Sequence, residues 1–91
     1  MYWVCLLANH GRSLYCGVTN DLTDRTYNHK FEYGSKFTTR HEINKLVWFE
    51  SYESLLPAIE REKQIKRWRR DKKVKLIEAM NPEWDDLYGS L

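Results

Sequence analysis

Two groups of side chains in this sequence have the types and spacing that chemistry on a charged substrate needs. The first lies in segment 55–68, whose apolar residues recur at helical spacing: Leu55, Ala58, Ile59, Ile65 and Trp68. The same stripe includes Glu62. A carboxylate on an inward face is costly unless it is paired or binds a cation. Glu62 is therefore expected either to form an ion pair with a neighbouring Arg or Lys or to bind a metal ion facing a cleft. We favour the metal ion.

The second group lies in the first expected helix, where Leu22, Arg25, His29 and Tyr33 share one face. Arg25 and His29 are one helical turn apart, so both side chains can reach a single anion. Charged pairs of this kind are common on helices and are usually exposed. Taken alone, the pair is a weak indication of an anion site.

Basic residues are concentrated in segment 61–75, which carries nine of the fifteen Lys and Arg and only two acidic residues, a local charge of +7. A basic face with Trp68 inside it is typical of nucleic-acid binding, whereas the alternative is a solvated basic helix. The residues expected to contact nucleic acid are Lys63, Lys66, Arg67, Arg69, Arg70, Lys72 and Lys73.

The elements that must position these residues begin with two short strands, 2–7 and 13–18. A three-residue loop, Asn9-His10-Gly11, would place Gly11 in the left-handed conformation and Cys5 opposite Tyr15. A two-residue loop, His10-Gly11, would place Cys5 opposite Cys16 instead. The sequence leaves both registers open.

A helix is expected over about 22–33, capped by Asn20 or Asp21 and ended by Gly34-Ser35, with a polar loop at 35–44. A third strand follows at 45–52. Ser54 is the expected cap of a helix that runs to about residue 67. Asp71 is the expected cap of a last helix through Ala79 or Met80, which Asn81-Pro82 stops. The order ββαβαα predicts an α+β fold, a small sheet with helices packed on it.

Length and composition exclude several classes of protein. The chain has 91 residues, enough for one domain, 1–91. It has no apolar run near the ~18 residues of a membrane span and no secretory signal pattern. Its two cysteines are too few for a disulfide framework, and with the histidines they lack the paired spacing of a zinc site. No nucleophile elbow indicates a serine or cysteine hydrolase. We expect a soluble, cytoplasmic protein with reduced thiols.

Several motifs in order resemble the GIY-YIG endonuclease domain, in particular its small standalone bacterial members. The resemblance covers nearly the whole chain and rests on 14–22 (LYCGVTNDL), Arg25, His29, 34–38 (GSKFT), 44–47 (NKLV), 61–66 (REKQIK), 81–84 (NPEW) and 86–88 (DLY). It implies a three-stranded antiparallel sheet flanked by helices. It also implies an endonuclease that hydrolyses phosphodiester bonds in duplex or branched DNA with one Mg²⁺ or Mn²⁺ ion, in DNA repair or recombination.

The resemblance also implies roles for individual residues. Tyr15 would be the tyrosine of the YIG motif and the general base, and Arg25 the phosphate-binding arginine. Glu62 would hold the metal ion, and His29 would orient Tyr15 or relay its proton. Asn81 would be the late asparagine of the family.

One position departs from the family pattern. Trp3-Val4-Cys5 occupies the first motif, so Cys5 stands where the family has a tyrosine, and Val18 replaces a lysine that some relatives carry. A thiol is a poor hydrogen-bond donor and cannot reach where a phenol hydroxyl would. The alternative to an active nuclease is therefore a catalytically weakened or inactive DNA-binding module. A third reading is a protein-interaction domain that docks a partner through the acidic 83–88 tail.

Overall fold

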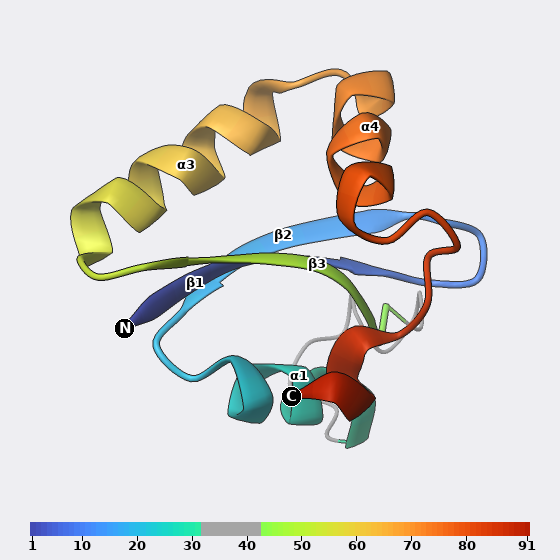
Figure 1. Cartoon of the computed structure of the whole chain (residues 1–91), viewed down its shortest axis with the longest axis horizontal. Coiled ribbons are helices and arrows are strands. Elements are labelled where there is room, and N and C mark those ends of the chain that lie inside the picture. Colours follow the sequence, from blue (N-terminus) through green and yellow to red (C-terminus); the bar gives the residue numbers. More distant parts are fainter. Residues whose placement is uncertain (32–42) are drawn as a thin grey trace.

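The computed structural model describes residues 1–31 and 43–91, and within these it leaves the side chains of residues 29–31 undescribed (Figure 1). Its elements are β1 (Tyr2–Ala8), β2 (Leu14–Thr19), α1 (Leu22–Phe31), β3 (Lys45–Tyr52), α3 (Leu55–Arg67), α4 (Arg70–Met80) and a 3₁₀ helix, η1 (Leu87–Ser90). The expected order ββαβαα is confirmed. The short helix η1 was not predicted, and the expected end of the first helix at Gly34-Ser35 lies outside the described residues.

The three strands form one antiparallel sheet in the order β2-β1-β3, as the resemblance implies. Helices α3 and α4 cover one face, while α1 and η1 lie on the other (Figure 1). The central strand β1 alternates between two cores. Val4, Leu6 and Ala8 belong to the core under α3 and α4, and Cys5 and Leu7 belong to the core on the α1 side. Because both faces are covered, the apolar run of β1 is buried on both sides.

Both registers expected for the first hairpin are wrong. Cys5 pairs with Gly17, so the loop spans residues 9–13. The side chain of Asn9 closes this loop, because its Oδ1 accepts a hydrogen bond from the Ser13 amide at 2.8 Å. The residue in the left-handed conformation is Arg12, with φ of 62°, rather than Gly11. The Arg12 guanidinium carbon lies 4.7 Å from the centroid of the Trp84 ring, a cation–π contact with a residue far along the chain that favours this loop.

The helix caps agree with the sequence at two of three positions. Asp21 caps α1, since its Oδ1 accepts a hydrogen bond from the Asp24 amide at 3.0 Å. Ser54 occupies the cap position of α3, although its side chain makes no capping hydrogen bond. The assignment of Asp71 as a cap is wrong, because α4 begins at Arg70 and Asp71 lies in its first turn. A negative charge is favourable there against the helix dipole.

Asn81 joins the end of α4 to the sheet. It stops α4 at Met80 as predicted, and its side chain is buried. Its Nδ2 donates to the carbonyls of Val47 at 3.1 Å and Asp85 at 2.8 Å, while its Oδ1 accepts from the Asp85 amide at 3.0 Å. Beyond it Trp84, only 2% exposed, packs in the core under α3 and α4. The chain after Asn81 is therefore part of the folded domain.

Replacing this amide should destabilise the domain. We expect Asn81→Ala to lower the free energy of unfolding by about 2–3 kcal/mol, because buried backbone groups lose their partners. Urea unfolding measures the change. Glu83→Ala, at an exposed position of the same segment, is the matched control and should leave stability nearly unchanged. Equal stability of the two variants would show that the Asn81 hydrogen bonds contribute nothing.

Candidate active site

Tyr15 of β2 and Arg25 of α1 are in direct contact. The Arg25 Nη2 donates a hydrogen bond to the Tyr15 hydroxyl oxygen at 2.7 Å, and the guanidinium carbon lies 5.7 Å from the centroid of the Tyr15 ring. Gly17 makes room for this pair. A Cβ at Gly17 would lie 3.2 Å from Tyr15 Cε1 and 3.3 Å from Arg25 Nη2, tighter than ordinary van der Waals contact. The glycine of the YIG motif thus lets a guanidinium pack against the strand backbone.

The guanidinium of Arg25 keeps an unsatisfied donor. Its Nε is buried and has no hydrogen-bond partner within residues 1–31 and 43–91. Buried donors are almost always paired, so such a group points to a ligand or a water molecule. A phosphate oxygen is a fitting acceptor, because guanidinium N–H groups bind phosphates with charge-assisted hydrogen bonds. This pocket of donors is therefore suited to an anion.

Cys5 lies beside this pair, at the position where the resemblance implies a tyrosine. Its thiol is fully buried and Cys5 pairs with Gly17. Burial raises the pKa of the Cys5 thiol to about 12, while the Arg25 guanidinium lowers it in part and the Glu62 carboxylate raises it. The thiol is therefore neutral and cannot replace a phenol hydroxyl. The charges of Arg25 and Glu62 both act on this one buried position.

Glu62 faces the sheet from α3, as its place on the apolar stripe predicts. Ala58 and Ile65, one turn to either side, are fully buried, and the Glu62 side chain is 19% exposed. Lys66 pairs with it, at 3.6 Å between Nζ and Oε2, so the ion-pair expectation is confirmed. Burial raises the pKa of the Cys16 thiol to about 11, and the Glu62 carboxylate is the next cause of that rise. Ala58 and Ile65 belong to the core under α3 and α4, as does Cys16 of β2, so Glu62 lies on that face of the sheet.

The edge strand β2 separates Glu62 from the Tyr15–Arg25 pair. Cys16 belongs to the core under α3 and α4, whereas its neighbour Tyr15 packs against the core on the α1 side. Successive side chains of a strand point to opposite faces. The structure thus brings Tyr15 and Arg25 into contact and places Glu62 across β2 from them.

Two further residues are expected to be catalytic, His29 and Asn81. His29 is on α1, one turn after Arg25, and its side chain lies outside the described residues. Asn81 uses its side-chain amide for the hydrogen bonds that hold Val47 and Asp85. A catalytic role for either residue stays a prediction.

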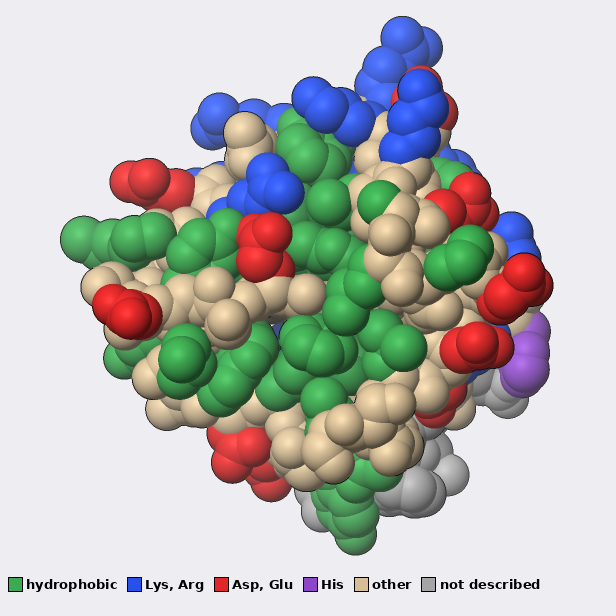
Figure 2. Space-filling view, in the orientation of Figure 1, with side chains coloured by type: hydrophobic (Ala, Val, Ile, Leu, Met, Phe, Trp, Pro, Cys, Tyr) green, Lys and Arg blue, Asp and Glu red, His purple; other side chains and the backbone are tan. Residues whose placement is uncertain are grey.

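Most basic residues of segment 61–75 are exposed at the junction of α3 and α4. Figure 2 shows Lys and Arg side chains gathered over these two helices, with hydrophobic side chains visible between them. Of the residues expected to contact nucleic acid, Lys73 is half-buried and the others are exposed: Lys63, Lys66, Arg67, Arg69, Arg70 and Lys72. Exposure leaves the charges of Lys63, Arg67, Arg69 and Arg70 accessible to a phosphate backbone. Lys66 also pairs with Glu62, and Lys72 lies over the Trp68 ring.

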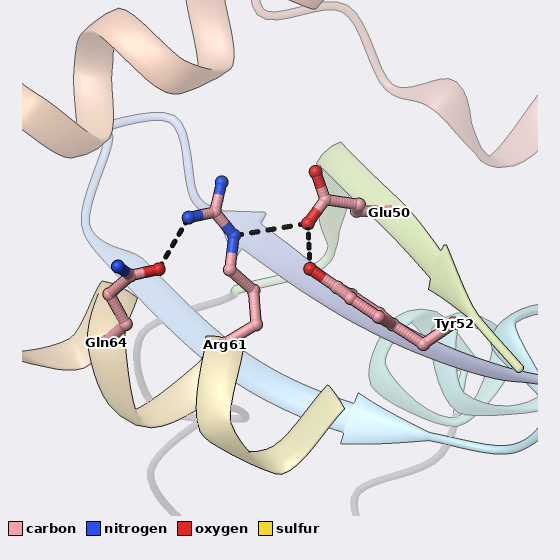
Figure 3. Close-up of polar contacts among 4 residues, drawn as sticks. All are labelled: Glu50, Tyr52, Arg61 and Gln64. Atoms are coloured by element: carbon pink, nitrogen blue, oxygen red, sulfur yellow. Dashed lines mark hydrogen bonds and ion pairs between the residues drawn. The ribbon is translucent and has the colours of Figure 1, made fainter. Parts of the chain in front are cut away.

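Arg61, in the same basic segment, forms hydrogen bonds within the protein, which the sequence did not indicate. Its Nε donates to Glu50 at 3.1 Å and its Nη1 to the Gln64 side chain at 2.6 Å (Figure 3). The Tyr52 hydroxyl also donates to Glu50. Burial raises the pKa of Tyr52, and this hydrogen bond raises it further. The cluster fixes α3 to β3. The signal for it is the i, i+2 spacing of Glu50 and Tyr52 on one strand face.

Comparison with known proteins identifies the family. Residues 1–75 match the family model of the GIY-YIG catalytic domain. The chain belongs to the GIY-YIG family. Because this family consists generally of nucleases, the chain has the fold of a nuclease that acts on DNA. None of the helices in the described part of the chain is long and apolar enough to cross a membrane.

Its relatives include small proteins of bacteria and archaea named UPF0213. One from Clostridium perfringens is 38% identical over 79 residues, which cover 87% of this chain and 85% of that protein. One from Haloquadratum walsbyi is 34% identical over 77 residues, covering 85% of this chain and 86% of that protein. The solution NMR structure of a UPF0213 protein from Bacillus halodurans matches with a TM-score of 0.60 at 26% identity, over 94% of this chain and 93% of that one.

The two buried thiols should make the domain sensitive to alkali. Their folded pKa values of about 12 and 11 lie above the ordinary value of 9.0. Above about pH 9 the unfolded chain therefore loses thiol protons that the folded chain keeps, and the free energy of unfolding falls as pH rises. The expected slope is up to about 1.4 kcal/mol per pH unit for each thiol.

Urea unfolding between pH 8 and pH 10.5, about the range in which a thiol titrates, tests this under reducing conditions. Replacing both Cys5 and Cys16 by Ala should flatten the dependence of stability on pH, whatever the change in stability at pH 8. If the double variant keeps the full slope, groups other than these two thiols cause the loss of stability at alkaline pH.

Proposed function

We propose that this protein is a metal-dependent endonuclease that hydrolyses phosphodiester bonds in DNA. The observation that carries the proposal is the contact of Arg25 with Tyr15, made by a guanidinium that still has a buried, unpaired N–H donor. An arginine that served only the fold would have its buried donors satisfied. A scissile phosphate beside Tyr15 would supply the acceptor.

Arg25 would bind the phosphate and offset the negative charge that develops on it in the transition state. Its second task is to hold the Tyr15 oxygen in place through their hydrogen bond. Tyr15 would then act as the general base that takes a proton from the attacking water. A positive charge beside the phenolic oxygen supports that role, because it stabilises negative charge there.

Glu62 would be the metal ligand. Within the described ranges no group of three or more His, Cys, Asp or Glu is placed to hold a metal ion. The single carboxylate of Glu62 fits Mg²⁺ or Mn²⁺, which can complete their coordination with waters and substrate oxygens. Lys66, 54% exposed, can turn into solvent and leave the carboxylate to the ion. A bound ion would polarise the scissile phosphate and stabilise the leaving oxygen. Since Glu62 and Arg25 act from the two faces of β2, we infer that the phosphate lies at the edge of that strand.

The exposed basic surface at the α3–α4 junction would hold the DNA. Lys and Arg contacts to phosphates release condensed counterions, which drives binding without reading the base sequence. This surface would therefore bind and position the DNA, while Tyr15, Arg25 and Glu62 would carry out the hydrolysis.

Cys5 favours a second candidate function, a DNA-binding module of the same fold without turnover. Its buried, neutral thiol supplies no hydroxyl at the position where the family has a tyrosine. If the missing phenol is indispensable for aligning the water, the protein binds DNA but does not cut it. The following two experiments separate these functions.

The first compares nicking of supercoiled DNA in the presence of Mg²⁺ or Mn²⁺. Arg25→Ala and Glu62→Ala should each lower the rate by about 100-fold, which corresponds to a loss of about 3 kcal/mol of transition-state stabilisation. Arg25→Lys should recover only part of it, because an ammonium lacks the planar fork of donors. Glu53→Ala, at an exposed acidic position before α3, is the matched control. Undiminished cleavage by Glu62→Ala would refute the metal-site assignment.

The second restores the missing hydroxyl. Cys5→Tyr should increase the nicking rate and reduce stability by about 1–3 kcal/mol, because the larger ring enters a closed core. Cys5→Phe brings the same ring without the hydroxyl and should not increase the rate. Nicking by Cys5→Tyr alone, with none by the natural chain, would establish the second candidate. Equal rates for the Tyr and Phe variants would rule out a role for the hydroxyl.

A further inference from the structure

We propose that the groove beside Trp68 binds one unpaired nucleotide of the DNA, with its base stacked on the Trp68 ring and its phosphate held by neighbouring basic side chains. This inference rests on the proposed binding of DNA and names the kind of DNA that the protein prefers. It concerns a site at the end of α3, separate from Tyr15, Arg25 and Glu62.

The groove lies along the outer side of α3. Its volume is about 520 Å³, and its lining residues are Glu60, Lys63, Gln64, Arg67 and Trp68. The first four follow the i, i+3, i+4, i+7 spacing of one helix face, and all four are exposed. The groove is therefore an open surface site within the size range of small-ligand sites.

Trp68 packs against the core while part of the residue remains accessible. It is half-buried at the C-terminal cap of α3 and packs against the core under α3 and α4. Two cations lie over the ring, with Arg61 Cζ at 5.2 Å and Lys72 Nζ at 4.4 Å from its centroid. An aromatic ring with a fixed position and cations beside it is the platform on which single-stranded nucleic acids stack their bases.

The two cations differ in how firmly they are held. Arg61 is fixed by hydrogen bonds to Glu50 and Gln64 (Figure 3). Lys72 is exposed, and its contact with the ring is a cation–π contact. Such a contact at an exposed site is worth about 0.5–1 kcal/mol, less than the ~1–3 kcal/mol of a stacked base. A base can therefore displace the Lys72 ammonium from the ring and pair it with a phosphate.

The remaining lining residues match a nucleotide rather than an apolar ligand. Lys63 and Arg67 place two positive charges in the groove against the one negative charge of Glu60. Because Gln64 Oε1 accepts from Arg61, the amide NH₂ group of Gln64 is available to donate to the edge of a base. The groove thus offers cations for the phosphate, an aromatic ring for the face of the base and an amide for its edge.

The consequence is a preference for DNA that contains unpaired nucleotides. Bases within a continuous duplex are stacked on each other and cannot reach Trp68, whereas those of an overhang, a flap or a branch point can. One stacked base should strengthen binding by about 5-fold or more, the equivalent of about 1 kcal/mol.

The test measures binding of the intact protein, in the presence of a chelator, to three labelled DNAs by fluorescence anisotropy. They are a continuous duplex, the same duplex with a thymidine overhang, and the same duplex with an abasic overhang that keeps the phosphates and lacks the bases. We expect the thymidine overhang to bind about 5-fold or more tightly than the other two. Equal affinity for the thymidine and abasic overhangs would overturn the proposal, since only phosphates would then be recognised.

Variants at the ring provide the second arm. Trp68→Leu should abolish the preference, whereas Trp68→Tyr, which can still stack, should retain it. Thermal unfolding checks that both variants fold, and the abasic comparison on the natural chain needs no variant. A preference that survives Trp68→Leu would also overturn the proposal. If the natural chain binds none of the three DNAs, the proposed function itself fails. If it binds and nicks duplex without preference, only this inference fails.

Discussion

The burial of β1 on both faces is the constraint that shapes this molecule. Residues Val4–Ala8 are at most 1% exposed, so the sheet needs a helical layer on each side. With β1 in the centre, β2 becomes an edge strand. An edge strand is the place where side chains from both layers can approach one ligand. Arg25 reaches β2 from α1, and Glu62 lies on α3, in the opposite layer. The position of the candidate site therefore follows from the hydrophobic pattern of its central strand.

Gly17 sets the second constraint, on how close the α1 layer approaches the strand. Tyr15 Cε1 and Arg25 Nη2 lie 3.2 and 3.3 Å from where its Cβ would be, so a larger side chain would push the guanidinium away from the backbone. Cys5 pairs with Gly17 and lies in the core on the α1 side. The family tyrosine at position 5 would thus add its hydroxyl to the neighbourhood of Arg25. Its replacement by a small thiol keeps the core closed and removes one polar group from the site.

Local sequence signals were enough for most of the fold, because short-range physics decides those features. The strand at 45–52 and the Asp21 cap agree with the structure, and Glu62 was found from its place on an apolar stripe. The hairpin register was not predictable in this way. It depends on a side-chain bond from Asn9 and on a contact between Arg12 and Trp84, 72 positions apart in the numbering. The two-residue error at the start of α4 arose because Arg69, and not Asp71, occupies the cap position, without a capping side chain.

Contacts that the sequence does not reveal also divide the basic segment 61–75, which in the sequence is one block of positive charge. Arg61 is neutralised by Glu50 and holds α3 to β3, and Lys66 is paired with Glu62. Neither charge is freely available to DNA in this state. The cations left to act at the surface surround Trp68 and the start of α4. Binding of a metal ion at Glu62 would release Lys66 and add it to that surface. A metal ion would neutralise Glu62, whose negative charge opposes DNA, and DNA would pair with Lys66, whose positive charge opposes a metal ion. Each would therefore favour binding of the other.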